Sequence, residues 1–307
     1  MTKQVLMSTG SLPFRTITAS VRTSVLTGLA LAAALFLPAV IQGQAPPDIP
    51  PPSDTLYEVS LADGSVIIAR IAEVDEERVV LTTPGGGRVE IGRDQIRGIR
   101  PVRGRVVEGE LWHEDPSTTR LLFTATGRSL GKGEAYVGTY VIALPFAAVG
   151  ITDRVSIAAG APVLFGELEP FYVGPRVQIV RTPKAQATLG TLVFFFDDEA
   201  VGIAYGVATL GDTDKALSAG LGFFYSGDDV ESEPAFMLGG ETRVSRRIKL
   251  MTENYLLPDA VGLVLSGGIR VIGERFATEI GVITVVAEDD AFCCIPLINF
   301  SYAFGRN

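Results

Sequence analysis

The chain has 307 residues, of which 47% are hydrophobic and 20% charged, and its net charge is −9. An acidic chain without a concentrated basic face argues against nucleic-acid binding. Cys293 and Cys294 are adjacent, so they supply no disulfide framework, and a bridge between strand neighbours is sterically poor. No stretch after Ala45 reaches the ~18 apolar residues of a spanning helix. An apolar content that is high but never continuous predicts β-strands in which apolar side chains alternate with small or polar ones.

Residues 1–45 have the pattern of a secretory signal peptide. A lead containing Lys3 and Arg15 precedes an apolar core at 25–37. The alternative is an N-terminal membrane anchor, for which this core is short. Residues 46–53 are rich in proline, which predicts an extended linker.

Residues 54–102 predict a small β domain, with Asp63-Gly64 as a good hairpin-turn signal. The five predicted strands are 56–61, 66–74, 78–83, 88–91 and 95–99. This arrangement resembles the small SH3-like or Sm-like barrels. The resemblance implies a packing or interaction domain. We do not carry over the RNA binding of some Sm-like proteins, because an exported acidic protein has little access to RNA.

Residues 103–118 form a predicted linker that contains the only tryptophan, Trp112. Tryptophan is common at membrane interfaces. A hydrophobic contact against the rim of the following domain explains it equally well.

Residues 119–307 alternate apolar with small or polar side chains, which is the period of β-strands. The stretches 201–210 and 216–226 carry no charge on either face. Behind an export signal, this pattern predicts an up-and-down transmembrane β-barrel. A soluble β-sandwich is the alternative, but its outward positions should be polar. The predicted fold class is therefore all-β, with a barrel preceded by a small SH3-like barrel.

The spacing of turn signals predicts about 12 barrel strands, the first beginning at Thr119. Tight turns are expected near 151–153, 182–184, 211–213, 245–246 and 273–274. Longer loops are expected near 128–133, 166–170, 197–199, 227–234, 258–259 and 288–291. An even number is usual for bacterial outer-membrane barrels. Ten strands remain possible if the first hairpin is a plug.

Four segments of this region resemble bacterial outer-membrane β-barrel proteins of uncharacterised function. They are 119–123, 130–136, the turn at 149–157 and the final strand at 298–304. The last strand of such barrels usually ends in an aromatic residue, whereas here three residues follow Phe304. The resemblance implies residence in the outer membrane, contact with its lipid, and a periplasmic N-terminal domain.

Acidic residues gather in the predicted longer loops, while basic residues lie near the tight turns. Carboxylate clusters suit divalent cations such as Ca²⁺ or Mg²⁺. The alternative is a set of solvated loops kept acidic for solubility. The acidic loop residues considered are Asp197, Asp198, Glu199, Asp228, Asp229, Glu288, Asp289 and Asp290.

The apolar register also directs a set of polar side chains to the inside of the barrel. They are Arg176, Gln178, Glu241, Arg243, Lys249, Glu253, Arg270 and Glu279. One interpretation is a polar lumen that steers small solutes. The other is a salt-bridged interior that fills the barrel. Barrels of about 8 strands are filled by side chains, and those of 16 or more leave a channel. A predicted number of 12 strands therefore does not distinguish the polar lumen from the filled interior.

Enzyme motifs are missing from the sequence. The barrel region holds no histidine, which excludes Ser-His catalysis, and the common hydrolase, metalloprotease and redox motifs do not occur. We expect no enzyme activity, no cofactor and no metal centre. The predicted function is a narrow pore or transport-associated barrel for small solutes. The alternative is a non-conducting structural or interaction protein anchored by its barrel, and the small domain is expected to have a periplasmic protein partner.

Overall fold

The computed structural model describes residues 48–162, 170–196, 199–227, 229–230, 233–257, 262–287 and 291–305. The predicted signal peptide lies outside the described residues. Among those described, no helix has the length and apolar character needed to cross a membrane.

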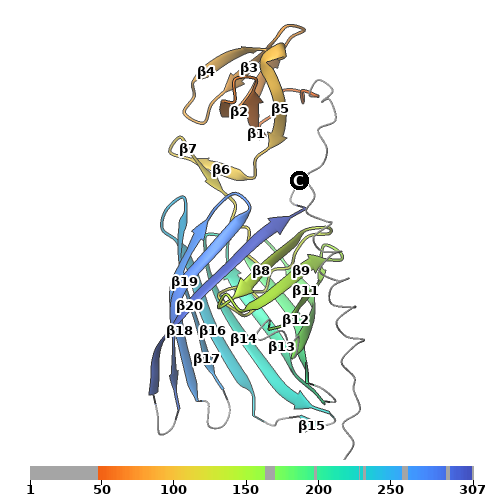
Figure 1. The fold of residues 1–307 in the computed structure, drawn as a ribbon, viewed down its shortest axis with the longest axis vertical. Helices are drawn as coiled ribbons and strands as arrows, with labels where there is room; N and C mark the ends of the chain where they lie inside the picture. Colours follow the sequence, from red (N-terminus) through yellow and green to blue (C-terminus); the bar gives the residue numbers. More distant parts are fainter. Residues whose placement is uncertain are drawn as a thin grey trace, which may run out of the picture. The chain divides into compact units, whose positions relative to one another are not determined.

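The segment after the proline-rich linker forms a five-stranded antiparallel sheet (Figure 1). Its strands are β1 (Leu56–Leu61), β2 (Val66–Val74), β3 (Arg78–Thr82), β4 (Arg88–Gly92) and β5 (Ile96–Pro101), with a 3₁₀ turn at Arg93–Gln95. The sheet order is β4-β3-β2-β1-β5, so β5 returns to pair with β1. Val59, Ala69 and Leu81 are fully buried at its core. All five strands match the sequence prediction closely.

The Asp63-Gly64 pair forms the first hairpin turn, as predicted. Gly64 has φ +86°, a conformation that glycine adopts without a steric cost. The hydroxyl and the backbone N–H of Ser65 donate to Asp63 Oδ1 at 2.6 and 2.9 Å. These bonds stabilise the carboxylate and lower the pKa of Asp63.

Residues 103–118, expected to be a linker, contain a hairpin of β6 (Gly104–Val107) and β7 (Glu110–His113). Trp112 on β7 lies against the guanidinium groups of Arg105 and Arg243, 5.5 and 4.9 Å from its ring centroid. Such cation–π contacts order an aromatic ring. Trp112 therefore contacts the end of a barrel strand through Arg243. Of the two alternatives, a membrane-interface position and a contact with the barrel rim, the structure shows the second. Partial burial lowers the pKa of His113.

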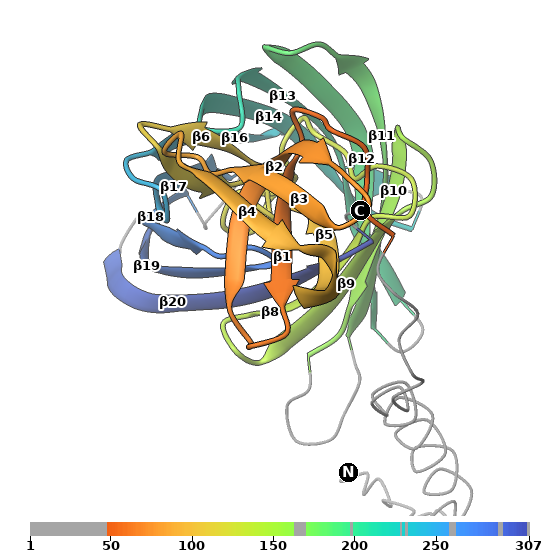
Figure 2. The ribbon, with the colours of Figure 1, turned by 90° about the horizontal axis from the view of Figure 1, so that it is seen from above.

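Twelve antiparallel strands form a closed barrel (Figures 1 and 2). They are β8 (Ala135–Tyr140), β9 (Leu144–Gly150), β10 (Val155–Gly160), β11 (Phe171–Arg181), β12 (Ala185–Phe196), β13 (Glu199–Gly211), β14 (Lys215–Ser226), β16 (Ala235–Arg243), β17 (Ile248–Leu256), β18 (Leu263–Ile272), β19 (Phe276–Val286) and β20 (Ala291–Phe304). Each strand pairs with its neighbour in the chain, and β20 pairs with β8 to close the wall. The two-residue strand β15 (Asp229–Val230) adds only an edge to β14. The predicted number of strands is correct.

Two of the predicted strands are placed differently. Residues 119–127, predicted to be the first strand, are not in the barrel wall. Residues 135–150, predicted to be a single strand, form the β8–β9 hairpin, with Tyr140 opposite Leu144. Its turn carries Val141 and Ile142 at φ +49° and +65°. Branched side chains rarely adopt this region, so no turn was predicted there. The two errors offset each other in the count.

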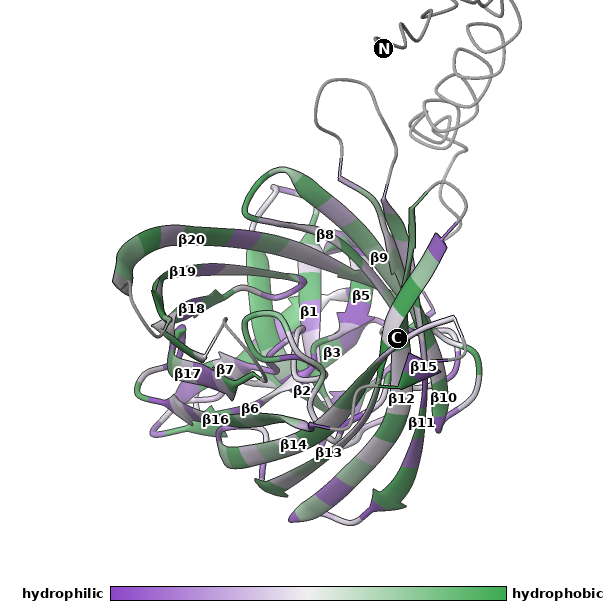
Figure 3. Ribbon diagram, turned by 90° about the horizontal axis from the view of Figure 1, so that it is seen from below, coloured by the Kyte–Doolittle hydropathy of each residue, from purple (hydrophilic) through white to green (hydrophobic). Residues whose placement is uncertain are grey.

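The outer face of the barrel is apolar, and hydrophilic and hydrophobic positions alternate along its strands (Figure 3). Leu210, Leu217 and Leu238, for example, are 64%, 66% and 61% exposed. Within the described strands, charged side chains on this face occur only at strand ends, as at Lys215. Soluble monomers rarely expose a continuous apolar surface of this kind.

Cys293 and Cys294 form a disulfide in the structure, which contradicts the expectation that adjacent strand residues do not pair. Cys294 has φ +71° and so leaves the extended conformation. In an extended strand the two side chains would point to opposite faces.

Candidate functional site: a plug inside the barrel

Residues 115–128, here called the plug, run through the interior of the barrel. Arg120 and Ala125 form an isolated antiparallel bridge, and Leu121 N–H donates to Thr124 O at 2.9 Å. The plug is thus a tight hairpin whose tip is at 121–124. Leu121 and Leu122 have no exposed surface. The alternating apolar and polar residues of 119–127, which resembled a barrel strand, therefore belong to a segment that the barrel wall surrounds.

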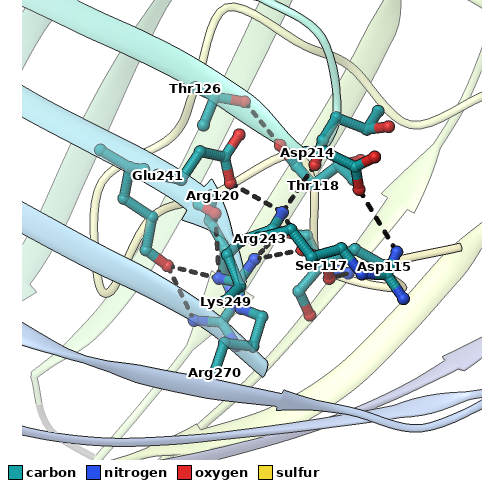
Figure 4. Close-up of polar contacts among 12 residues, drawn as sticks. Asp115, Ser117, Thr118, Arg120, Thr126, Asp214, Glu241, Arg243, Lys249 and Arg270 are labelled. Carbon is teal, nitrogen blue, oxygen red and sulfur yellow. Dashed lines mark hydrogen bonds and ion pairs between the residues drawn. The ribbon is translucent and has the colours of Figure 1, made fainter. Parts of the chain in front are cut away.

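Asp115 starts the plug and lies in a buried network of ion pairs (Figure 4). Its Oδ2 accepts from Lys249 Nζ at 2.5 Å and from Arg270 Nη1 at 3.0 Å. Lys249 Nζ also donates to Glu241 Oε2 at 2.9 Å, and Glu241 Oε1 accepts from Arg128 Nη1 at 2.6 Å. The network therefore connects both ends of the plug to three wall strands, β16, β17 and β18.

A second chain of ion pairs holds the middle of the plug. Glu279 Oε1 accepts from Arg120 Nη2 at 2.9 Å and from Arg270 Nε at 2.8 Å. Arg270 also donates to the carbonyl groups of Ser117 at 2.9 Å, Arg120 at 3.1 Å and Leu121 at 2.9 Å. One wall arginine therefore binds three successive regions of the plug, and its side chain is completely buried.

Glu253 binds the tip of the plug without a cationic partner. Its carboxylate accepts the backbone N–H groups of Leu122 at 2.6 Å, Phe123 at 3.1 Å and Thr124 at 2.9 Å. Tyr255 also donates its hydroxyl to this carboxylate. A buried carboxylate can be held by several N–H donors in place of a counter-ion. Glu253 thus fixes the conformation of the tip.

The opposite side of the wall binds the plug backbone. Arg176 donates to Thr119 O at 3.1 Å and to Ser156 Oγ at 2.9 Å. Gln178 donates to Gly127 O at 2.9 Å. Arg243 is the one predicted inward residue for which the described residues give no hydrogen bond or ion pair to the plug. It pairs with Asp214 in a tight turn at 3.3 Å.

The eight predicted inward residues are therefore all in strands, and seven of them bind the plug. The plug's own charged residues, Asp115, Arg120 and Arg128, were not among the site residues predicted from the sequence. The sequence feature that could have identified them is the presence of charged residues within or beside a segment with the pattern of an apolar strand. Glu241 and Glu279 are each bound to two basic side chains.

The acidic loop residues are only partly described. Glu199 and Asp229 are exposed at the starts of β13 and β15. Asp197, Asp198, Asp228, Glu288, Asp289 and Asp290 lie outside the described residues. In the described part of the chain, no three His, Cys, Asp or Glu side chains are grouped as a metal site would require. Divalent-cation binding stays a prediction.

No protein-family model and no curated protein matches the chain. Solved structures with similarity include OmpTdeltaL8, a loop L8 deletion mutant of OmpT, an outer membrane protein of Vibrio cholerae. It is 12% identical, with 81% of this chain and 96% of that chain covered and a TM-score of 0.32. Salmonella typhi OmpF in complex with daunomycin is 10% identical, with 81% and 95% covered and a TM-score of 0.33.

Proposed function

We propose that the chain is an outer-membrane barrel protein, closed by its own plug, that anchors a small β domain in the periplasm. The class of fold is plain, since twelve antiparallel strands close on themselves. The apolar outer face supports the membrane location, because each inward Arg or Lys side chain would cost about 2–4 kcal/mol if it faced the bilayer midplane. Turning them inward and surrounding them with the plug removes this cost.

The observation that carries the proposal is the buried network between the plug and the wall. A water-filled pore would leave polar side chains of the wall solvated. Here Lys249, Arg270, Glu253 and Glu279 have no exposed surface. Their hydrogen-bonding groups are directed at the plug instead. This favours the non-conducting anchor over the narrow pore, which would require the plug to leave.

Conductance in planar bilayers tests this proposal. We expect the refolded full chain to give no channel steps. Replacing residues 119–127 by a Gly-Ser segment of equal length should produce steps, because it removes the buried Leu121 and Leu122 side chains and the ion pair between Arg120 and Glu279. Steady steps from the unaltered chain would overturn the anchor in favour of the pore. Heat-modifiable migration of the outer-membrane fraction on a gel tests the location separately.

We also propose that the five-stranded sheet is an SH3-like interaction domain. Its strand order, with β5 returning to β1, and its single apolar core support this assignment. Deleting residues 54–102 should leave conductance absent, because the plug remains, and should remove a periplasmic protein from crosslinked pulldowns. An unchanged set of captured proteins would contradict the interaction role.

A further inference from the structure

The interior of the barrel is chemically divided at the tip of the plug. One part is filled by the plug and its ion pairs. Beyond Phe123 and Thr124 lies a cavity of about 440 Å³, here called the apolar chamber. This volume is in the usual range for small-molecule sites.

The walls of the chamber are made by inward residues of six successive strands, β13, β14 and β16–β19. The side chains that define it include Ile203, Val207, Met237, Leu257, Val264 and Ile283. No charged residue is among the described residues that line it. An inner face of this composition differs from the polar lumen expected of a solute channel.

Three of the four side-chain hydroxyl groups at the chamber, those of Thr124, Tyr255 and Ser266, are already hydrogen-bonded. Thr124 and Tyr255 are hydrogen-bonded to each other, and Tyr255 also donates to Glu253. The hydroxyl of Ser266 donates to the backbone carbonyl of Glu253. A water molecule needs two to four polar partners, and these groups offer few free ones. The chamber therefore suits a hydrocarbon ligand better than water or a polar solute.

In the described part of the chain, the barrel wall is short along the strand direction at β8 and β9. Asn299 connects the plug tip to their turn, since it accepts Val141 N–H at 3.1 Å and donates to Leu122 O at 2.9 Å. The turn of this hairpin is thus level with the tip, where the chamber begins. Strands β8 and β9 have 6 and 7 residues, short of the ~9–11 that span a bilayer. Phe224 lines the chamber and is still 36% exposed.

We propose that the apolar chamber binds a single alkyl chain that enters from the surrounding bilayer. This inference rests on the proposed membrane location. The chamber offers apolar walls, no counter-ion for a charged group and a volume suited to one chain. Met237 supplies an adaptable wall that accommodates different chain positions. The low wall at β8–β9 gives an acyl chain a lateral route.

Photolabelling of the full chain in phosphatidylcholine vesicles tests the proposal. One arm contains a phosphatidylcholine with a diazirine at the end of one acyl chain. The other contains a free long-chain alcohol with the same group. Mass spectrometry then locates the adducts. We expect both probes to label inner residues such as Met237 as well as outer residues such as Leu238.

Ala235→Phe fills the chamber and should lower the inner adducts about tenfold, the effect of excluding a few methylenes. Leu238→Phe, on the outer face of the same strand, is the matched control and should leave them unchanged. If Ala235→Phe does not fold, Val264→Phe on β18 makes the same test.

The outcomes separate the two proposals. Labelling of the outer face alone overturns the chamber as an alkyl site while leaving the membrane location intact. Inner labelling by the alcohol alone overturns entry from the bilayer. Absence of adducts on the outer face contradicts the membrane location itself.

Discussion

Arg270→Met should lower the free energy of unfolding of the barrel by about 3–5 kcal/mol, the cost of breaking a buried ion pair by removing one partner. The substitution removes the donors to Asp115 and Glu279, at 3.0 and 2.8 Å. It also leaves three plug carbonyl groups without this partner. The remaining cations, Lys249 and Arg120, hold only part of the negative charge.

Urea titration of the refolded chain in detergent micelles measures this change. Arg275→Met, in the exposed turn between β18 and β19, is the matched control and should change stability by less than about 0.5 kcal/mol. The loss of stability in Arg270→Lys should be smaller than that in Arg270→Met and larger than that in Arg275→Met, because one ammonium group cannot reach all five acceptors. Equal midpoints for Arg270→Met and Arg275→Met would show that the network does not stabilise the barrel.

The strands and the face that each side chain occupies follow from the sequence because the period of two leaves little choice. Charged residues such as Lys249 and Glu279 cannot face lipid cheaply, so the inward set was predictable. The five strands of the small domain were predictable for the same reason, with Asp63-Gly64 marking the first turn.

The same pattern allowed a plug only as an alternative that came with a ten-stranded barrel, and it favoured a wall strand at 119–127. A hairpin enclosed by a barrel must bury side chains on more than one side, so Leu121, Leu122 and Phe123 resemble a strand. The turn between β8 and β9 was not predicted for a different reason. Val141 and Ile142 occupy positive φ values where glycine or asparagine would be expected. The partners of Arg120 and Arg128 are more than 100 positions away in the sequence, at Glu279 and Glu241, so only the closed fold brings them together.

Glu253→Gln should release the tip of the plug. An amide keeps one acceptor oxygen and presents N–H donors to backbone N–H groups that need an acceptor. Leu122 and Phe123 donate to one carboxylate oxygen and Thr124 to the other, so at least one of the three bonds is then lost or made repulsive. Each buried donor left without a partner costs about 1–3 kcal/mol. We therefore expect the tip to open about a hundredfold more often, which corresponds to about 2.7 kcal/mol.

Limited trypsinolysis measures this opening, because Arg120 and Arg128 flank the tip and are buried in the closed state. Cleavage after these arginines should accelerate in Glu253→Gln in proportion to the open population, provided that closing is faster than cleavage. Tyr255→Phe removes only the tyrosine hydroxyl from the same carboxylate and serves as the matched control, with a much smaller acceleration. If both variants are cut at the rate of the unaltered chain, the carboxylate does not hold the tip, and the plug depends on its ion pairs alone.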